Sequence, residues 1–234
     1  MQGLGSTDIF ATKGIEYLIV IAYLILLVGF WRLLARPRRT PASASAPGRD
    51  PATANGWFDV RDGFYFHQGH AWAFPEDDGV VRIGMDDFAM RLLGQPGSVH
   101  LPAAGEYVRQ GERGWEVEVD SNPIPVLSPV DGQVVAVNTD LCDAPELVSA
   151  EPYDGGWLLK VQAGYAPASL KNLLTGQLAR AWMNQTVEKV RRMQNGQLGI
   201  VMPDGGIPVD GFVRMLAPDR WAEVAREFLL SDKE

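Results

Sequence analysis

The sequence predicts a mainly β protein with peripheral α-helices and one transmembrane helix. Beyond residue 79, short segments rich in β-branched or aromatic residues alternate with Gly, Pro, Asn or Asp, a pattern typical of a β-rich domain. Near the N-terminus, the stretch from Ile15 to Leu34 contains only two charged residues, both near its ends. The 234 residues, 46% hydrophobic and 21% charged, suffice for one globular domain with its own core and for additional segments.

The N-terminal apolar stretch is long enough for a membrane anchor, because a helix of about 20 residues spans roughly 30 Å, the thickness of a bilayer's hydrocarbon core. Within this stretch, the uninterrupted apolar run from Tyr17 to Trp31 is followed by four arginines, Arg32, Arg36, Arg38 and Arg39, and Lys13 is the only basic residue before the run. A cleavable signal peptide would carry its basic residues before the apolar run. We therefore expect a single-pass anchor in a bacterial-type inner (plasma) membrane, with the C-terminal domain in the cytoplasm.

Composition changes sharply after the anchor. Residues 37–55 contain repeated Pro, Ala and Ser and almost no bulky apolar side chain, which indicates a linker. Residues 1–50 hold six basic and three acidic residues and carry a net charge of +3. The remaining residues hold 15 basic and 26 acidic side chains, a net charge of −11. An acidic body argues against nucleic acid as a partner and against direct adhesion to anionic lipid.

The body is expected to contain strands at residues 80–83, 115–119, 133–137 and 157–161. The segment 115–119 alternates Trp and Val with Glu, as a half-buried strand does. Helices are expected at residues 86–93, 179–193 and 218–230. The last two have apolar faces at helical spacing, formed by Ala179, Met183, Val187 and Val190, and by Trp221, Val224, Ala225, Phe228 and Leu229.

Catalytic and metal-binding constellations are not apparent in the sequence. His67 and His70 are three residues apart in a β-rich stretch, so their side chains would lie on opposite faces. The pairs Asp77-Asp78 and Asp86-Asp87 are explained by helix capping or solvation. The single cysteine, Cys142, cannot form an intramolecular disulfide, and no Cys or His cluster has zinc-ligand spacing. We expect no enzymatic activity, no metal and no cofactor.

Four blocks in a fixed order carry a family resemblance: His70-Ala71-Trp72, residues 79–89, residues 126–138, and residues 145–148 with 151–161. Together they resemble the H protein of the glycine cleavage system, over roughly Phe64 to Leu174. The resemblance implies a barrel-sandwich hybrid, the fold of lipoyl domains. The expected organisation is an N-terminal segment and anchor at 1–36, a linker at 37–55, an H-protein-like domain at 56–174 and a C-terminal helical extension at 175–234.

One family feature is expected to be missing. In that family, a lysine seven residues before the Ser of a Ser-Pro-x-x-Gly segment carries lipoic acid on an amide. Here the segment begins at Ser128, and the attachment position holds Ser121, whose hydroxyl cannot form that amide. Pro123 and Pro125 remove backbone donors and favour a stiff, exposed edge or loop. An alternative function of this loop is insertion into a partner through Ile124.

These observations predict a non-catalytic, membrane-anchored accessory subunit of a membrane protein complex, such as a respiratory or other redox assembly. Its partners would be the membrane and other subunits, with Ile124, Trp221 and Phe228 as candidate contacts. For Trp221 and Phe228, packing in the core of this chain is the alternative to contact with a partner. The alternative function is a carrier or enzyme-associated module in lipoate or one-carbon metabolism, modified elsewhere, with Lys160 and Lys171 as the lysines to consider. A ligand-binding regulator is a third possibility.

Overall fold

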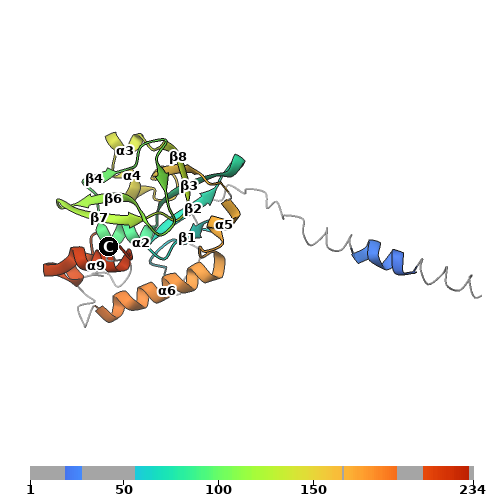
Figure 1. The fold of residues 1–234 in the computed structure, drawn as a ribbon. Coiled ribbons are helices and arrows are strands. Elements are labelled where there is room, and N and C mark those ends of the chain that lie inside the picture. The colour runs from blue at the N-terminus through green and yellow to red at the C-terminus, as the bar shows by residue number, and fades with distance from the viewer. Residues whose placement is uncertain (1–18, 28–55, 165, 194–207, 232–234) are drawn as a thin grey trace, which may run out of the picture. The chain divides into compact units, whose positions relative to one another are not determined.

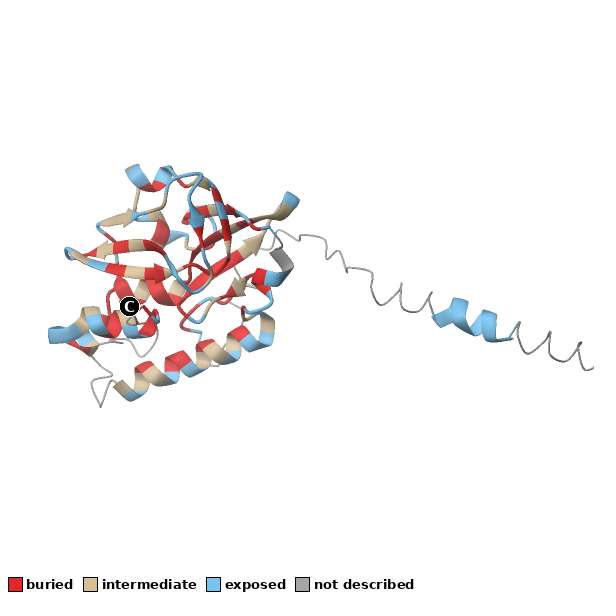
Figure 2. Cartoon of the chain, viewed as in Figure 1, coloured by how far each residue is buried: buried red, intermediate tan, exposed pale blue. Residues whose placement is uncertain are grey.

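The computed structural model describes residues 19–27, 56–164, 166–193 and 208–231 (Figure 1), and the chain divides into two units between Gly48 and Arg49. In the first unit, residues 19–27 form a helix that is exposed along its length (Figure 2). The rest of the expected anchor and the expected linker lie outside the described residues. Among the residues described, no helix combines the length and apolar character that crossing a membrane requires. The transmembrane anchor therefore stays a prediction.

The second unit is built on two antiparallel sheets. The larger has six strands in the described part of the chain, in the order β1-β2-β3-β9-β8-β5. Its strands are β1 (Tyr65–Phe66), β2 (Ala71–Pro75), β3 (Val80–Met85), β5 (Tyr107–Val108), β8 (Gly132–Val137) and β9 (Leu159–Gln162). The smaller sheet has the order β4-β6-β7, with β4 (Ser98–His100), β6 (Arg113–Val119) and β7 (Asn122–Leu127). The four expected strands are all present, with boundaries shifted by a few residues.

Helices surround the sheets and fill the connections between strands. They are η1 (Asp77–Gly79), α2 (Asp87–Leu93), α3 (Asp140–Asp143), α4 (Leu147–Ala150), α5 (Ala166–Leu170), α6 (Gly176–Met193), α8 (Val213–Leu216), η2 (Pro218–Arg220) and α9 (Trp221–Phe228). The expected capping role of the Asp86-Asp87 pair is confirmed, because Asp86 Oδ1 accepts a hydrogen bond from the Ala89 amide at the start of α2.

Helix α6 packs its apolar face on the unit, as the spacing of its apolar residues predicts. Ala179, Met183, Val187 and Val190 are buried, and buried and solvent-facing residues alternate along the helix (Figure 2). Helix α9 likewise buries Val224, Ala225 and Phe228. The apolar stripes of both helices therefore fold back on their own domain.

Trp72 occupies the centre of the core and is fully buried. Its indole Nε1 lies 2.8 Å from the carbonyl oxygen of Met85 and 3.0 Å from that of Pro152, so the only polar atom of the side chain is satisfied. The ring lies edge-on to Phe64 at 5.1 Å between centroids. Opposite Trp72 in the β2–β3 register is Gly84, and the indole ring occupies the space where a side chain at position 84 would start.

We predict that Gly84→Ala destabilises the fold, because the new Cβ would lie 2.5 Å from Trp72 Cζ2 and a buried indole has no room to retreat. The expected loss of unfolding free energy is about 1–3 kcal/mol, measured by urea denaturation. Gly164→Ala is the matched control, since nothing lies within 4 Å of a Cβ built there. Equal denaturation midpoints for the two variants would contradict this packing.

Candidate functional site

The β6–β7 hairpin ends in a two-residue turn formed by Asp120 and Ser121. Both residues have left-handed backbone conformations, with φ of 49° and 61°, and the strand register closes at the pair Val119 and Asn122. Two successive residues with positive φ are characteristic of the tight hairpin turns that match strand twist. The Asn122 side-chain amide donates to the Asp120 carbonyl oxygen at 2.9 Å and supports the turn. This geometry places Ser121, exposed, at the tip of the hairpin.

The two faces of the hairpin differ in character. Ile124 pairs with Val117, and both side chains are fully buried. The candidate partner contact Ile124 therefore faces the core and offers no exposed apolar surface. Pro123 and Pro125 alternate with it on β7, which pairs only with β6 and is an edge strand of the small sheet. The expected edge position of the two prolines is confirmed, because an edge strand tolerates missing amide donors.

The C-terminal segment, residues 208–231, contacts the hairpin through two arginines. Arg214 Nε donates to Asp120 Oδ2 at 2.7 Å, directly at the turn. Arg226 Nη2 donates to the Pro123 carbonyl oxygen at 2.9 Å, on the edge strand. Helix α9 lies beside β7 (Figure 1), so the segment covers the edge that the small sheet would otherwise present.

Arg214 is held in place by contacts on several sides. Its Nη1 donates to the Leu93 carbonyl oxygen at 3.0 Å, at the end of α2, and its guanidinium lies 5.1 Å from the centre of the Trp221 ring. Gly211, with φ of 73°, leaves the space that the guanidinium fills, since a Cβ there would collide with Nη1. An arginine fixed this way loses little further freedom when it binds Asp120.

The aromatic candidates Trp221 and Phe228 both pack inside the unit. Phe228 is buried, with its ring 5.4 Å from that of Phe88 and the Lys189 ammonium 4.4 Å from its centre. Trp221 is half-buried beneath the Arg214 guanidinium. Both residues therefore pack within this chain. This is the core-packing role that the sequence analysis gives as the alternative to contact with a partner.

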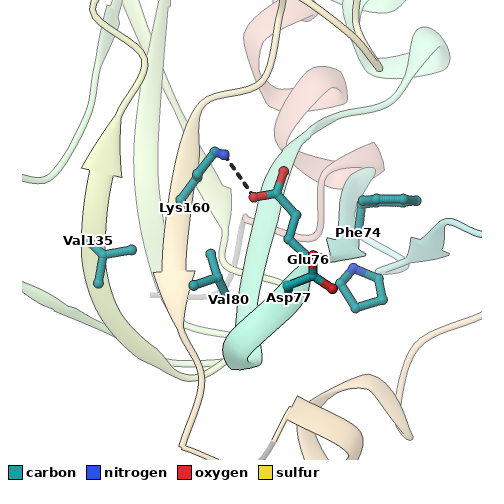
Figure 3. Close-up of a pocket in the computed structure, with 7 residues that line it drawn as sticks. Phe74, Glu76, Asp77, Val80, Val135 and Lys160 are labelled. Atoms are coloured by element: carbon teal, nitrogen blue, oxygen red, sulfur yellow. Dashed lines mark hydrogen bonds and ion pairs between the residues drawn. The ribbon is translucent and has the colours of Figure 1, made fainter.

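A second candidate region is a shallow hollow of about 610 Å³ beside β9 (Figure 3). Lys160 projects into it from β9 and donates to Glu76 Oε2 at 2.8 Å, and Val80 and Val135 line the same hollow. Lys160 also lies 5.5 Å from the centre of the Trp157 ring. The amine is thus engaged in an ion pair on a strand and is not presented on a turn.

The loop between β1 and β2 lies next to the C-terminal segment. The Gly69 amide donates to His67 Nδ1 at 3.0 Å, and a Cβ on Gly69 would lie 2.7 Å from the Leu229 carbonyl oxygen. His70 is buried with its Nδ1 2.7 Å from Asp86 Oδ2, and its ring stacks on Phe88 at 4.2 Å. His67 and His70 lie in the connection between β1 and β2, not on a strand as the sequence analysis assumed, and their ring nitrogens have different partners. The described residues contain no group of three or more His, Cys, Asp or Glu arranged to hold a metal ion.

The contacts of Arg214, Arg226 and Asp120 are the part of this site that the sequence analysis missed. Arg214 is 94 positions from its partner Asp120, and Arg226 is 103 positions from its partner Pro123, so no local pattern connects the arginines to the hairpin. The orientation of Ile124 did have a local signal. In the run from Asn122 to Val126, prolines alternate with apolar residues, which is the period of two that a half-buried strand shows.

Comparison with known proteins gives consistent matches. The family model described as Glycine cleavage H-protein matches residues 64–186, past the expected limit of the resemblance at Leu174. The probable glycine cleavage system H protein of Pyrococcus abyssi is 37% identical over 119 residues, which cover 51% of this chain and 88% of that protein. The glycine cleavage system H protein of Hydrogenovibrio crunogenus is 45% identical over 92 residues, 39% of this chain and 71% of that protein.

A solved structure also matches. The crystal structure of a glycine cleavage system H protein from Mycobacterium marinum is 32% identical, covers 54% of this chain and 98% of its own, and has a TM-score of 0.47. Arg214 and Arg226 both lie beyond the residues that the family model matches.

We predict that His67 makes stability depend on pH in the mildly acidic range. Burial lowers the pKa of His67, and the neighbouring His70 lowers it further. The unfolded chain therefore takes up a proton at a higher pH than the folded chain does, and unfolding free energy falls as pH drops below the ordinary value of 6.5 and through the lowered pKa. His67→Asn should flatten this dependence while its side-chain oxygen still accepts from the Gly69 amide.

The measurement is urea denaturation between pH 7.5 and pH 5, with His100→Asn, at an exposed histidine, as the control. Burial raises the pKa of Asp87, which titrates in the opposite sense but is common to all three proteins. If wild type and His67→Asn lose stability in parallel, His67 does not carry the effect.

Proposed function

Because this chain belongs to the glycine cleavage H-protein family, we propose that it works as an enzyme-associated module in lipoate-linked or one-carbon metabolism, without carrying a lipoyl group at its hairpin tip. The mainly β, H-protein-like fold with peripheral helices agrees with this membership. The family protein is a carrier and not a catalyst, so the expectation that this chain is not an enzyme is confirmed.

The observation that carries the proposal is the residue at the tip. In the family, this hairpin presents a lysine whose amine forms an amide with lipoic acid. The hairpin here, residues 113–127, contains no lysine, and Ser121 occupies the exposed turn. A serine hydroxyl does not replace an amine in that linkage, so the tip does not fit the lipoyl group. What remains is a domain with the shape of the carrier, suited to contact the enzymes that a carrier serves.

The lysines in the described part of the chain, Lys160, Lys171 and Lys189, lie away from the hairpin tip in sequence. Lys160 is held by Glu76 and lies on a strand, without the exposed turn that a modifying enzyme needs. Lys189 lies on α6 with its ammonium near Glu227 and over the Phe228 ring. Lys171 is exposed after α5, away from the hairpin in sequence. A carrier function moved to one of these three lysines would have to use an ion-paired position on a strand or helix, or the exposed Lys171.

We predict that the chain purified from its native host carries no lipoyl or biotinyl group. Intact-mass measurement should give the unmodified mass, and peptide mapping should show each lysine free of the adduct. The control is an H protein with its lysine, purified from the same cells, which should be modified. High occupancy of a lipoyl group on any lysine of this chain would replace the proposal with the carrier function.

A second candidate function rests on the N-terminal sequence. The apolar stretch 15–34 and the arginines that follow it suit a membrane anchor, and an H-protein-like domain tethered there would serve as an accessory subunit of a membrane complex, respiratory or otherwise redox. In this function the partners are the membrane and other subunits, and the body lies in the cytoplasm. The two functions are compatible if the enzymes concerned are themselves bound to the membrane.

The anchor predicts a defined topology. In a Cys142→Ser background, cysteine introduced by Ser6→Cys should react with a membrane-impermeant reagent added to intact cells. Cysteine introduced by Ser43→Cys should react only after the cells are opened, because the arginines after the span hold that side in the cytoplasm. The reverse pattern would refute the orientation, and reaction of neither or both sites in intact cells would refute a single span.

A further inference from the structure

The contacts at the hairpin tip assign a role to the C-terminal segment that goes beyond the proposed function but rests on it. We infer that residues 208–231 brace the β6–β7 hairpin and occlude it, so that an enzyme acting on position 121 cannot enclose the tip. Replacing Ser121 with lysine would then not by itself restore a carrier. The segment lies outside the residues matched by the family model, and the brace is therefore an addition to the shared domain.

The brace acts at two places on the hairpin. Arg214 binds the carboxylate of Asp120, the residue immediately before Ser121. Arg226 binds the main-chain carbonyl of Pro123, two residues after it. The segment is thus tied to residues on both sides of Ser121, to Asp120 through its side chain and to Pro123 through its main-chain carbonyl. Opening the strand ends or bending the tip outward requires both contacts to break.

The brace itself is anchored in the core and does not behave as a loose tail. Phe212, Val213, Val224 and Leu229 are buried to 1% exposure or less. The Phe212 ring lies 6.0 Å from Phe88, and the Gly211 amide donates to the Arg91 carbonyl oxygen at 2.8 Å. Detaching the segment would expose this apolar surface to water, which is strongly unfavourable. The segment is therefore a standing part of the fold, and its two arginines reach the hairpin from fixed positions.

Occlusion follows from where α9 lies. We assume that an enzyme which modifies position 121 contacts the strands on both sides of the turn, including the outer edge of β7. Here that edge belongs to β7, and α9 lies beside it (Figure 1). From α9, the Arg226 side chain reaches the Pro123 carbonyl oxygen. Ser121 and its neighbours Asp120 and Pro123 are exposed to solvent, so the hindrance that we infer comes from the Arg214 and Arg226 side chains that bind these two neighbours.

The first test measures the brace directly, by hydrogen–deuterium exchange of the full-length chain in detergent. The double variant Arg214→Ala/Arg226→Ala should speed exchange of the hairpin amides at 117–122 by about threefold or more, with peptides from β2 and β3 unchanged. Asp120→Asn is a milder variant that keeps a residue suited to the left-handed turn, and it should speed exchange at the tip alone. Arg220→Ala, on the same segment, is the matched control and should leave the hairpin unchanged.

The second test measures occlusion, with a lipoate–protein ligase, lipoate and ATP as the probe. Ser121→Lys in the otherwise native chain should be modified at a rate at least about tenfold lower than Ser121→Lys combined with Arg214→Ala/Arg226→Ala, because only the latter frees the tip. Mass spectrometry of the hairpin peptide gives the rate. The combination of Ser121→Lys with Arg220→Ala should behave like Ser121→Lys alone.

Each outcome bears on the inference. Unchanged hairpin exchange in the double variant overturns the brace. Equal modification of Ser121→Lys with and without the arginines, or modification of neither, overturns occlusion by the segment. These failures are distinct from failure of the proposed function, which would show as a lipoyl group on a native lysine of the unaltered chain.

Discussion

The packing of Phe88 joins the H-protein-like domain to its C-terminal segment, and the arrangement of the hairpin depends on it. The ring lies 4.2 Å from His70, 5.0 Å from Phe58 and 5.4 Å from Phe228. Aromatic pairs of this kind each contribute about 0.5–1.5 kcal/mol beyond the area they bury. By fixing Phe228, this cluster fixes α9, and α9 places Arg226 against β7. A polar contact at the surface thus depends on an apolar contact in the core.

Much of the domain was predictable because its signals are local. The alternation in 115–119, the acidic residue before α2 and the apolar spacing of α6 each lie within a few residues of one another. The alternation of Ile124 with two prolines indicates a half-buried strand, and the prolines themselves favour an edge strand or a loop; the inward orientation of Ile124 follows only if the edge strand is chosen. The contact of Arg214 with Asp120 had no local signal, since surface charges pair according to the tertiary fold.

Two features of this chain meet at the hairpin tip. Ser121 occupies the tip, and a segment beyond the family match is bonded to the residues on either side of it. On the proposed function the two features agree, because a tip that carries no lipoyl group needs no access for a modifying enzyme. The β-rich shape is retained by a core that includes Trp72 and Val117, neither of which depends on the tip.

The pairing of Phe88 with Phe228 also has a consequence for how the chain is made. During synthesis, the strands and α2 leave the ribosome long before residue 228 has been translated. Phe88 then lacks one of its ring partners, and the edge of β7 lacks its cover, which are the conditions under which partly folded chains associate wrongly. A chain terminated before α9 would keep the contacts of Phe88 with Phe58 and His70 but would expose the Phe88 ring toward Phe228 and the edge of β7.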